Sequence, residues 1–118
     1  MTADRAARLG ARWLIAALFA AGAAQKALDP SGAGVLLTDR GLPFALIWPA
    51  LAFNAAAALA LIAGWRTAEW ALALAAYCAA TSVFHLVPDD PWQMSIFVKN
   101  WAIAGGCLAL FAVERRPG

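Results

Sequence analysis

Residues 42–64 read LPFALIWPALAFNAAAALALIAG and contain no charged side chain. The hydrocarbon core of a bilayer takes about 20 apolar residues of α-helix, so this stretch is long enough to cross it. Asn54, near the middle, is its only amide. The stretch predicts a membrane-spanning helix, in which Pro49 is a candidate for a kink because proline removes a backbone hydrogen bond.

Three other stretches, about residues 9–28, 68–87 and 92–113, are apolar over similar lengths. The whole chain has 118 residues, of which 64% are hydrophobic and 14% are charged, and its mean hydropathy is +0.69. A soluble domain of this size has no need of such a composition. We expect one transmembrane domain over residues 1–118, an all-α four-helix bundle surrounded by a lipid bilayer.

The segment between the first two spans carries the signals of a separate short helix. Asp29 is a good N-cap, Pro30 suits a first helical turn, and Gly41 follows Arg40 where a helix would end. Such a helix is too short to cross the membrane. We expect it to lie flat at the membrane interface.

Basic residues are divided unequally between the two sets of span ends. Lys26 and Arg40 flank one set. The other set holds Arg5, Arg8, Arg12, Arg66, Arg115 and Arg116. By the positive-inside rule, this distribution puts both termini in the cytoplasm. The basic residues form no continuous stripe, which argues against nucleic acid as a partner.

Small residues are expected to hold the bundle together, because lipid gives apolar helices no hydrophobic reason to associate. Ala16, Ala20 and Ala24 recur every four residues in the first span. Gly105 and Gly106 offer a similar surface in the fourth span. A bundle of this size is also a candidate for a homo-oligomer.

Three polar residues inside the spans are assigned structural roles. Tyr77 and Thr81 begin a polar stripe that continues to His85 at the same four-residue spacing and is expected to face the bundle interior. Tyr77 would support packing, and Thr81 would bond back to its own helix. Asn54 is expected to form an interhelical hydrogen bond.

Six further polar residues lie near the span ends opposite the termini. They are Gln25, Lys26, His85, Gln93, Lys99 and Asn100. Helical side chains lean toward the N-terminus of their helix, so His85 and Lys99, on antiparallel spans, are expected to approach each other. This predicts a small outward-facing site under the short helix, whose donors favour a carbonyl or anionic ligand. The alternatives are that Lys26 extends to the lipid headgroups and that His85 is merely solvated.

The chain has a single histidine and two cysteines, Cys78 and Cys107, which form no CxxC pair. This set matches no zinc, haem or iron–sulfur pattern. We predict no metal site and no covalently bound cofactor. Both cysteines are interpreted as small buried hydrophobic residues.

Two segments of the chain resemble a known family. Residues 12–26 read RWLIAALFAAGAAQK and are followed by Asp29-Pro30, and residues 97–108 fit the pattern FxKNxxxxGGxL. In combination they resemble the DoxX family of bacterial four-span membrane proteins. The resemblance implies a four-span bundle in the bacterial cytoplasmic (inner) membrane. It also implies that polar positions of the family are occupied here by Lys26, His85, Lys99 and Asn100.

One position departs from this family. Many relatives carry an acidic residue in the second span, where this chain has Asn54. A role for an intramembrane carboxylate is therefore not expected in this chain. The resemblance also implies an association with quinone-linked sulfur oxidation or with membrane oxidoreductase complexes.

The first functional hypothesis is a subunit or accessory of a quinone-linked membrane oxidoreductase system, with a quinone as a non-covalent ligand. A partner membrane or periplasmic protein would have to bring the electrons. The alternative is a non-catalytic membrane module that binds a partner protein or a lipid. A small cation exporter is disfavoured, because the first span contains no membrane-embedded carboxylate.

Overall fold

The structure is a computed structural model that describes residues 2–115. Within these residues the chain is helical and contains no strand. Its elements are α1 (Ala3–Leu28), α2 (Pro30–Thr38), η1 (Phe44–Leu46), α3 (Ile47–Ala63), α4 (Thr67–Thr81), η2 (Ser82–His85) and α5 (Pro91–Glu114). The α1 and α5 helices, together with α3 extended by η1 and α4 extended by η2, are the four segments of residues 2–115 that are long and apolar enough to cross a membrane. The prediction of an all-α, multi-pass membrane protein is confirmed.

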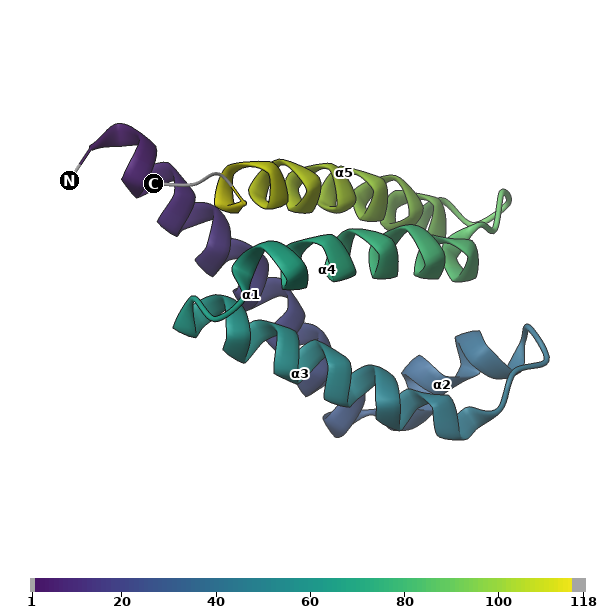
Figure 1. The fold of residues 1–118 in the computed structure, drawn as a ribbon. Coiled ribbons are helices and arrows are strands. Elements are labelled where there is room, and N and C mark those ends of the chain that lie inside the picture. The colour runs from purple at the N-terminus through teal and green to yellow at the C-terminus, as the bar shows by residue number, and fades with distance from the viewer. Residues whose placement is uncertain (1, 116–118) are drawn as a thin grey trace.

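The four spans are arranged as two antiparallel pairs, α1 with α3 and α4 with α5. Figure 1 shows the pairs converging near the chain termini and diverging toward α2. The molecule measures 46 × 26 × 19 Å. Its long dimension is comparable with the thickness of a bilayer that includes its headgroup layers, about 40–45 Å.

The core consists largely of small side chains at which the helices approach closely. Its fully buried members include Ala16, Ala57 and Ala71, which pack with Leu61 and Leu74. Close backbone approach through alanine is the expected way to hold helices together in lipid. The core therefore lies within the helix pairs and in the region where they converge.

The small-residue face predicted for α1 is only partly right. Ala16 is buried, but Ala20 and Ala24 are exposed, and the buried face continues through Phe19 and Ala23. A strict four-residue repeat drifts around a helix of 3.6 residues per turn, whereas alternating steps of three and four stay on one side. Gly105 and Gly106 are likewise exposed, with open space where a Cβ would stand.

The short helix α2 has the predicted end signals. The Asp29 carboxylate accepts a hydrogen bond of 3.1 Å from the Gly32 amide, Pro30 occupies the first turn, and Gly41 follows the helix with a φ of +74°. Gly34 packs directly on the ring of Phe44, with no space for a Cβ. This contact fixes α2 against the start of the α3 span, beside the open end of the bundle (Figure 1).

The kink considered at Pro49 is not required by the structure. Helix α3 begins at Ile47, so Pro49 lies in its first turn. Backbone N–H groups in a first turn have no intrahelical acceptor, so proline removes no bond there. The preceding residues form the 3-10 turn Phe44–Leu46 instead of extending the helix back to Leu42.

Two arginines join neighbouring helices at the converging end of the bundle. The Arg12 side chain donates from Nε to the Leu61 carbonyl at 2.8 Å and from Nη2 to the Ile62 carbonyl at 3.1 Å. It thereby satisfies carbonyls that the end of α3 would otherwise leave free. Arg8 Nη2 lies 3.0 Å from Glu114 Oε2, which joins α1 to α5.

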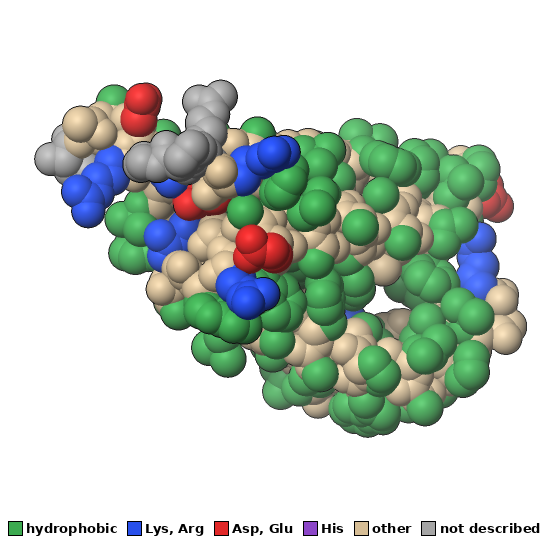
Figure 2. Space-filling view, in the orientation of Figure 1, with side chains coloured by type: hydrophobic (Ala, Val, Ile, Leu, Met, Phe, Trp, Pro, Cys, Tyr) green, Lys and Arg blue, Asp and Glu red, His purple; other side chains and the backbone are tan. Residues whose placement is uncertain are grey.

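The basic residues gather at the end that holds residues 2 and 115, as Figure 2 shows. Arg5, Arg8, Arg12 and Arg115 belong to α1 and to the end of α5, and Arg66 lies in the α3–α4 turn. Arg116 lies outside the described residues. Lys26 and Arg40 are at the opposite end, so the unequal distribution read from the sequence also exists in space.

Candidate functional site

The central feature of the candidate site is a hydrogen bond between two membrane-embedded polar residues. Lys26 Nζ, from the last turn of α1, donates to Asn54 Oδ1, in the middle of α3, at 2.8 Å. Asn54 is 1% exposed, and Lys26 is half-buried. The side chain of Lys26 leans toward the N-terminus of α1 and therefore into the bundle, instead of extending to the lipid headgroups. The interhelical hydrogen bond predicted for Asn54 is confirmed.

Asn54 keeps one unmet donor. Its Nδ2 is buried and has no hydrogen-bond partner among the described residues. A buried donor without an acceptor costs about 1–3 kcal/mol. On the other side of the pair, a Cβ added at Gly22 would stand 3.6 Å from Asn54 Oδ1 and 3.8 Å from Lys26 Nζ. These are ordinary van der Waals distances, so an alanine at this position would also leave the two polar groups room to meet.

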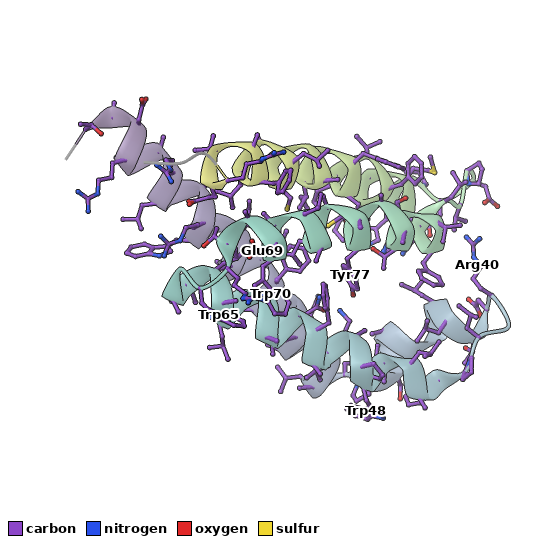
Figure 3. All side chains as sticks on the ribbon, viewed as in Figure 1. Arg40, Trp48, Trp65, Glu69, Trp70 and Tyr77 are labelled. Atoms are coloured by element: carbon purple, nitrogen blue, oxygen red, sulfur yellow. The ribbon has the colours of Figure 1, made fainter. Side chains whose placement is uncertain are left out.

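Tyr77 brings a third polar group to this place from the other helix pair. Figure 3 shows its side chain projecting from α4 into the gap between α4 and α3. Its ring centroid is 5.0 Å from that of Phe53 and 6.2 Å from that of Phe19. Tyr77 lies within interaction range of the Asn54 side chain, but no hydrogen bond joins its hydroxyl to Asn54 Nδ2. We call Lys26, Asn54 and Tyr77 the polar centre.

Tyr77, one of the three residues of the polar centre, lies beside a hollow between the two helix pairs. Figure 2, in the orientation of Figure 3, shows the surface hollowed between the α4–α5 layer and the α2–α3 layer, beside the position of Tyr77. At the open end, Arg40 reaches across and its Nη2 donates to the Leu86 carbonyl at 3.3 Å (Figure 3). This contact from the loop after α2 bridges the open end of the hollow.

A second polar pair lies near the same end of α4 and α5. His85 Nδ1 and Gln93 Oε1 are 2.7 Å apart, and because an amide oxygen only accepts, the histidine nitrogen donates. The expected approach of His85 to Lys99 is wrong, because His85 is held by Gln93. The cause is the 3-10 turn Ser82–His85, in which the chain advances faster around the axis and leaves the four-residue stripe of α4.

The six predicted site residues therefore do not form one cluster. Lys26 joins Asn54, and His85 joins Gln93. Gln25 and Lys99 are exposed on the surface. Asn100 is half-buried. A similar depth along the helices does not decide which way each side chain faces, so it could not predict these partners.

The structural assignment of Thr81 is confirmed. Its Oγ1 donates to the Tyr77 carbonyl at 2.8 Å, and the neighbouring Ser82 Oγ donates to the Ala79 carbonyl at 2.6 Å. These bonds consume hydroxyl groups that would otherwise face apolar surroundings. Of the polar residues on α4, Tyr77 is therefore the one that contributes its side chain to the polar centre.

The Lys26–Asn54 pair is not among the sequence predictions, which assign Lys26 to the outward-facing site and Asn54 to a structural role. A usable signal existed. Lys26 is the charged residue within residues 13–28, and Asn54 is the amide of an uncharged span. In hydrocarbon each such group needs a polar partner, and α1 and α3 are close enough in the chain to pack as neighbours.

Chemically, the polar centre offers donors to a ligand. The Lys26 ammonium has three N–H bonds and donates one of them to Asn54. Asn54 Nδ2 donates neither of its N–H bonds within residues 2–115, and Tyr77 adds a hydroxyl group. An oxygen acceptor would satisfy these donors, and it would reach Asn54 Nδ2, which is buried, only where the helix pairs separate further. Comparisons of the chain with models of known protein families, with curated proteins and with solved structures found no match.

Proposed function

We propose that this chain is a DoxX-like subunit or accessory of a quinone-linked oxidoreductase system in the bacterial cytoplasmic membrane, with both termini in the cytoplasm. In this proposal a quinone binds non-covalently in the hollow, with one of its carbonyl oxygens against the polar centre. The observation that carries the proposal is the unmet Nδ2 donor of Asn54 beside the Lys26 ammonium.

A quinone suits these donors for physical reasons. Its carbonyl oxygens accept hydrogen bonds and donate none, which complements Asn54 Nδ2 and the free N–H bonds of Lys26. Its ring is flat and apolar, and the aromatic rings of Phe53, Phe19 and Tyr77 lie next to the polar centre. Its tail dissolves in lipid, so a hollow between membrane helices is accessible to it.

The reaction itself would take place together with a partner. One histidine and two separated cysteines supply no pattern for a haem or an iron–sulfur cluster, so electrons would come from a partner membrane or periplasmic protein. The role of this chain would be to hold and orient the quinone. The residues that do so are Lys26 and Asn54, with Tyr77 on the opposite wall.

A second candidate function is a non-catalytic module that binds a partner protein or a lipid. It is favoured by the surface of α5, where Trp101, Gly105, Gly106 and Leu108 are all exposed. Lys99 is exposed on the same helix, although charged groups are costly where they face hydrocarbon. A surface of this composition is typical of helices that associate in membranes.

The test is to purify the protein from its own membrane and to measure co-purified quinone by extraction and mass spectrometry. We expect wild-type protein to retain quinone and the Lys26→Met, Asn54→Leu double variant to lose it. Lys99→Met removes an exposed lysine at similar depth and should retain quinone. Absence of quinone from the wild type, with a partner protein retained instead, would support the second candidate.

A further inference from the structure

A crevice of about 510 Å³ opens at the converging end of the molecule, between the first turns of α1 and the last turn of α5. Three arginines, Arg5, Arg8 and Arg12, line it, together with the acids Asp4 and Glu114. None of these residues belongs to the polar centre. The crevice is a separate site, and its lining points to a different ligand.

The position of the crevice follows from the length of α1. This helix has 26 residues and is therefore about 39 Å long, roughly 9 Å longer than the hydrocarbon core. Its first turns extend beyond the ends of the apolar spans, into the headgroup layer. Arg5, Arg8 and Arg12 recur at spacings of three and four and so lie on one face of α1.

The arginines leave donors available in the crevice. Arg8 donates from Nη2 to Glu114, and Arg12 donates from Nε and Nη2 to carbonyls at the end of α3. Arg5 donates no side-chain hydrogen bond within residues 2–115. Guanidinium groups form paired, charge-assisted hydrogen bonds with phosphate oxygens. The crevice is thus equipped for an oxyanion.

The charge balance specifies the anion further. Among the described residues of the lining, three arginines face two carboxylates, which leaves one excess positive charge. A phosphodiester carries one negative charge and would neutralise it. A ligand that also carries an ammonium group would place that group among guanidinium groups, where it is repelled. The preferred ligand is therefore anionic as a whole.

We propose that this crevice is a specific site for the phosphodiester of an anionic phospholipid. The site lies where lipid headgroups are always present, and basic pockets between helix ends are known to take anionic headgroups. Arg5 and Arg8 contact the phosphodiester, and Arg12 orders the floor of the crevice by capping α3. The proposal is independent of whether the polar centre binds a quinone.

Native mass spectrometry tests the proposal directly. Full-length protein is equilibrated in detergent micelles that contain equal amounts of phosphatidylglycerol and phosphatidylcholine. We expect the wild type to retain phosphatidylglycerol, and Arg5→Gln to lower the lipid-bound fraction at least fivefold. Arg115→Gln is the matched control, because Arg115 lies at the same end and stacks on Phe111 outside the crevice. It should retain the lipid as the wild type does.

The Glu114→Gln variant should have the opposite effect on the retention of phosphatidylglycerol. It frees Arg8 from its ion pair and raises the excess positive charge of the lining, so retention of phosphatidylglycerol should increase. Equal losses in Arg5→Gln and Arg115→Gln would overturn the proposal in favour of diffuse attraction. Equal retention of the two lipids by the wild type would overturn it as well.

Discussion

The Lys26 ammonium and the Asn54 amide oxygen, 28 positions apart in the chain, lie 2.8 Å apart and join α1 to α3 inside the membrane. Within residues 2–115, neither residue forms a hydrogen bond or an ion pair with an acidic side chain. The pair is therefore a charged donor held by a neutral acceptor, and its stability depends on both partners being present.

Removing one partner should cost more than removing both. Lys26→Met leaves both ends of the buried Asn54 amide without partners and should lower the free energy of unfolding by about 1–2 kcal/mol. The Lys26→Met, Asn54→Leu double variant replaces both polar groups by apolar ones of similar size and should recover most of that loss. Reversible unfolding in mixed micelles measures both values. A double variant less stable than the single one would contradict the pairing.

Replacing Gly64 and Gly106 by alanine should have opposite effects on the stability of the protein. Gly64 has a φ of +76°, and a Cβ there would stand 3.0 Å from Arg12 Nη2. Gly64→Ala should therefore cost about 1–2 kcal/mol in stability. Gly106 lies within α5 with open space around it, so Gly106→Ala should be neutral or stabilise by about 0.5–1 kcal/mol. Thermal unfolding of the two variants side by side makes the comparison.

The contact between Gly34 and Phe44 should control the position of α2. Gly34→Ala introduces a methyl group where the Phe44 ring already lies, so α2 should separate from the start of the α3 span. Amide hydrogen exchange over residues 30–38 is expected to accelerate. The Gly34→Ala, Phe44→Ala double variant has room for the methyl group and should exchange more slowly than the single variant. Equal exchange in the single variant and wild type would show that α2 is held by other contacts.

The proposed orientation can be tested by chemical labelling. Cys78 and Cys107 are buried, so a cysteine introduced at the surface should be the one that reacts with a maleimide. Asp39→Cys lies at the α2 end and should react with an impermeant maleimide on intact cells. Glu69→Cys lies by the α3–α4 turn and should react only after the membrane is permeabilised. The reverse pattern would place both termini outside the cytoplasm.

The positions of the spans were predictable because they depend on properties that are local in the sequence. Apolar runs end where Asp29-Pro30, Gly64 and Asp90 stop or start a helix, and the observed helices follow these signals. The distribution of arginines between the two ends was predictable for the same reason. Each conclusion required only the order of residues along one helix.

The composition of the site was less predictable because it depends on how helices are rotated and where their pitch changes. The meeting of Lys26 with Asn54 requires knowing that α1 packs on α3. The pairing of His85 with Gln93 requires the 3-10 turn after Thr81, which no residue type in that segment specifies. The polar residues were found from sequence, whereas their partners were set by tertiary packing.

The arrangement in two pairs has a consequence for how the protein is made. Helices α1, α2 and α3 form one continuous length of chain, and α4 and α5 form the next, so every closely packed pair is complete soon after its second helix is synthesised. Each pair can leave the translocon as a helical hairpin, with its long-range contacts to the other pair added later. Two separately expressed fragments, divided in the Gly64–Arg66 turn, should therefore assemble in one membrane into the same four-helix protein.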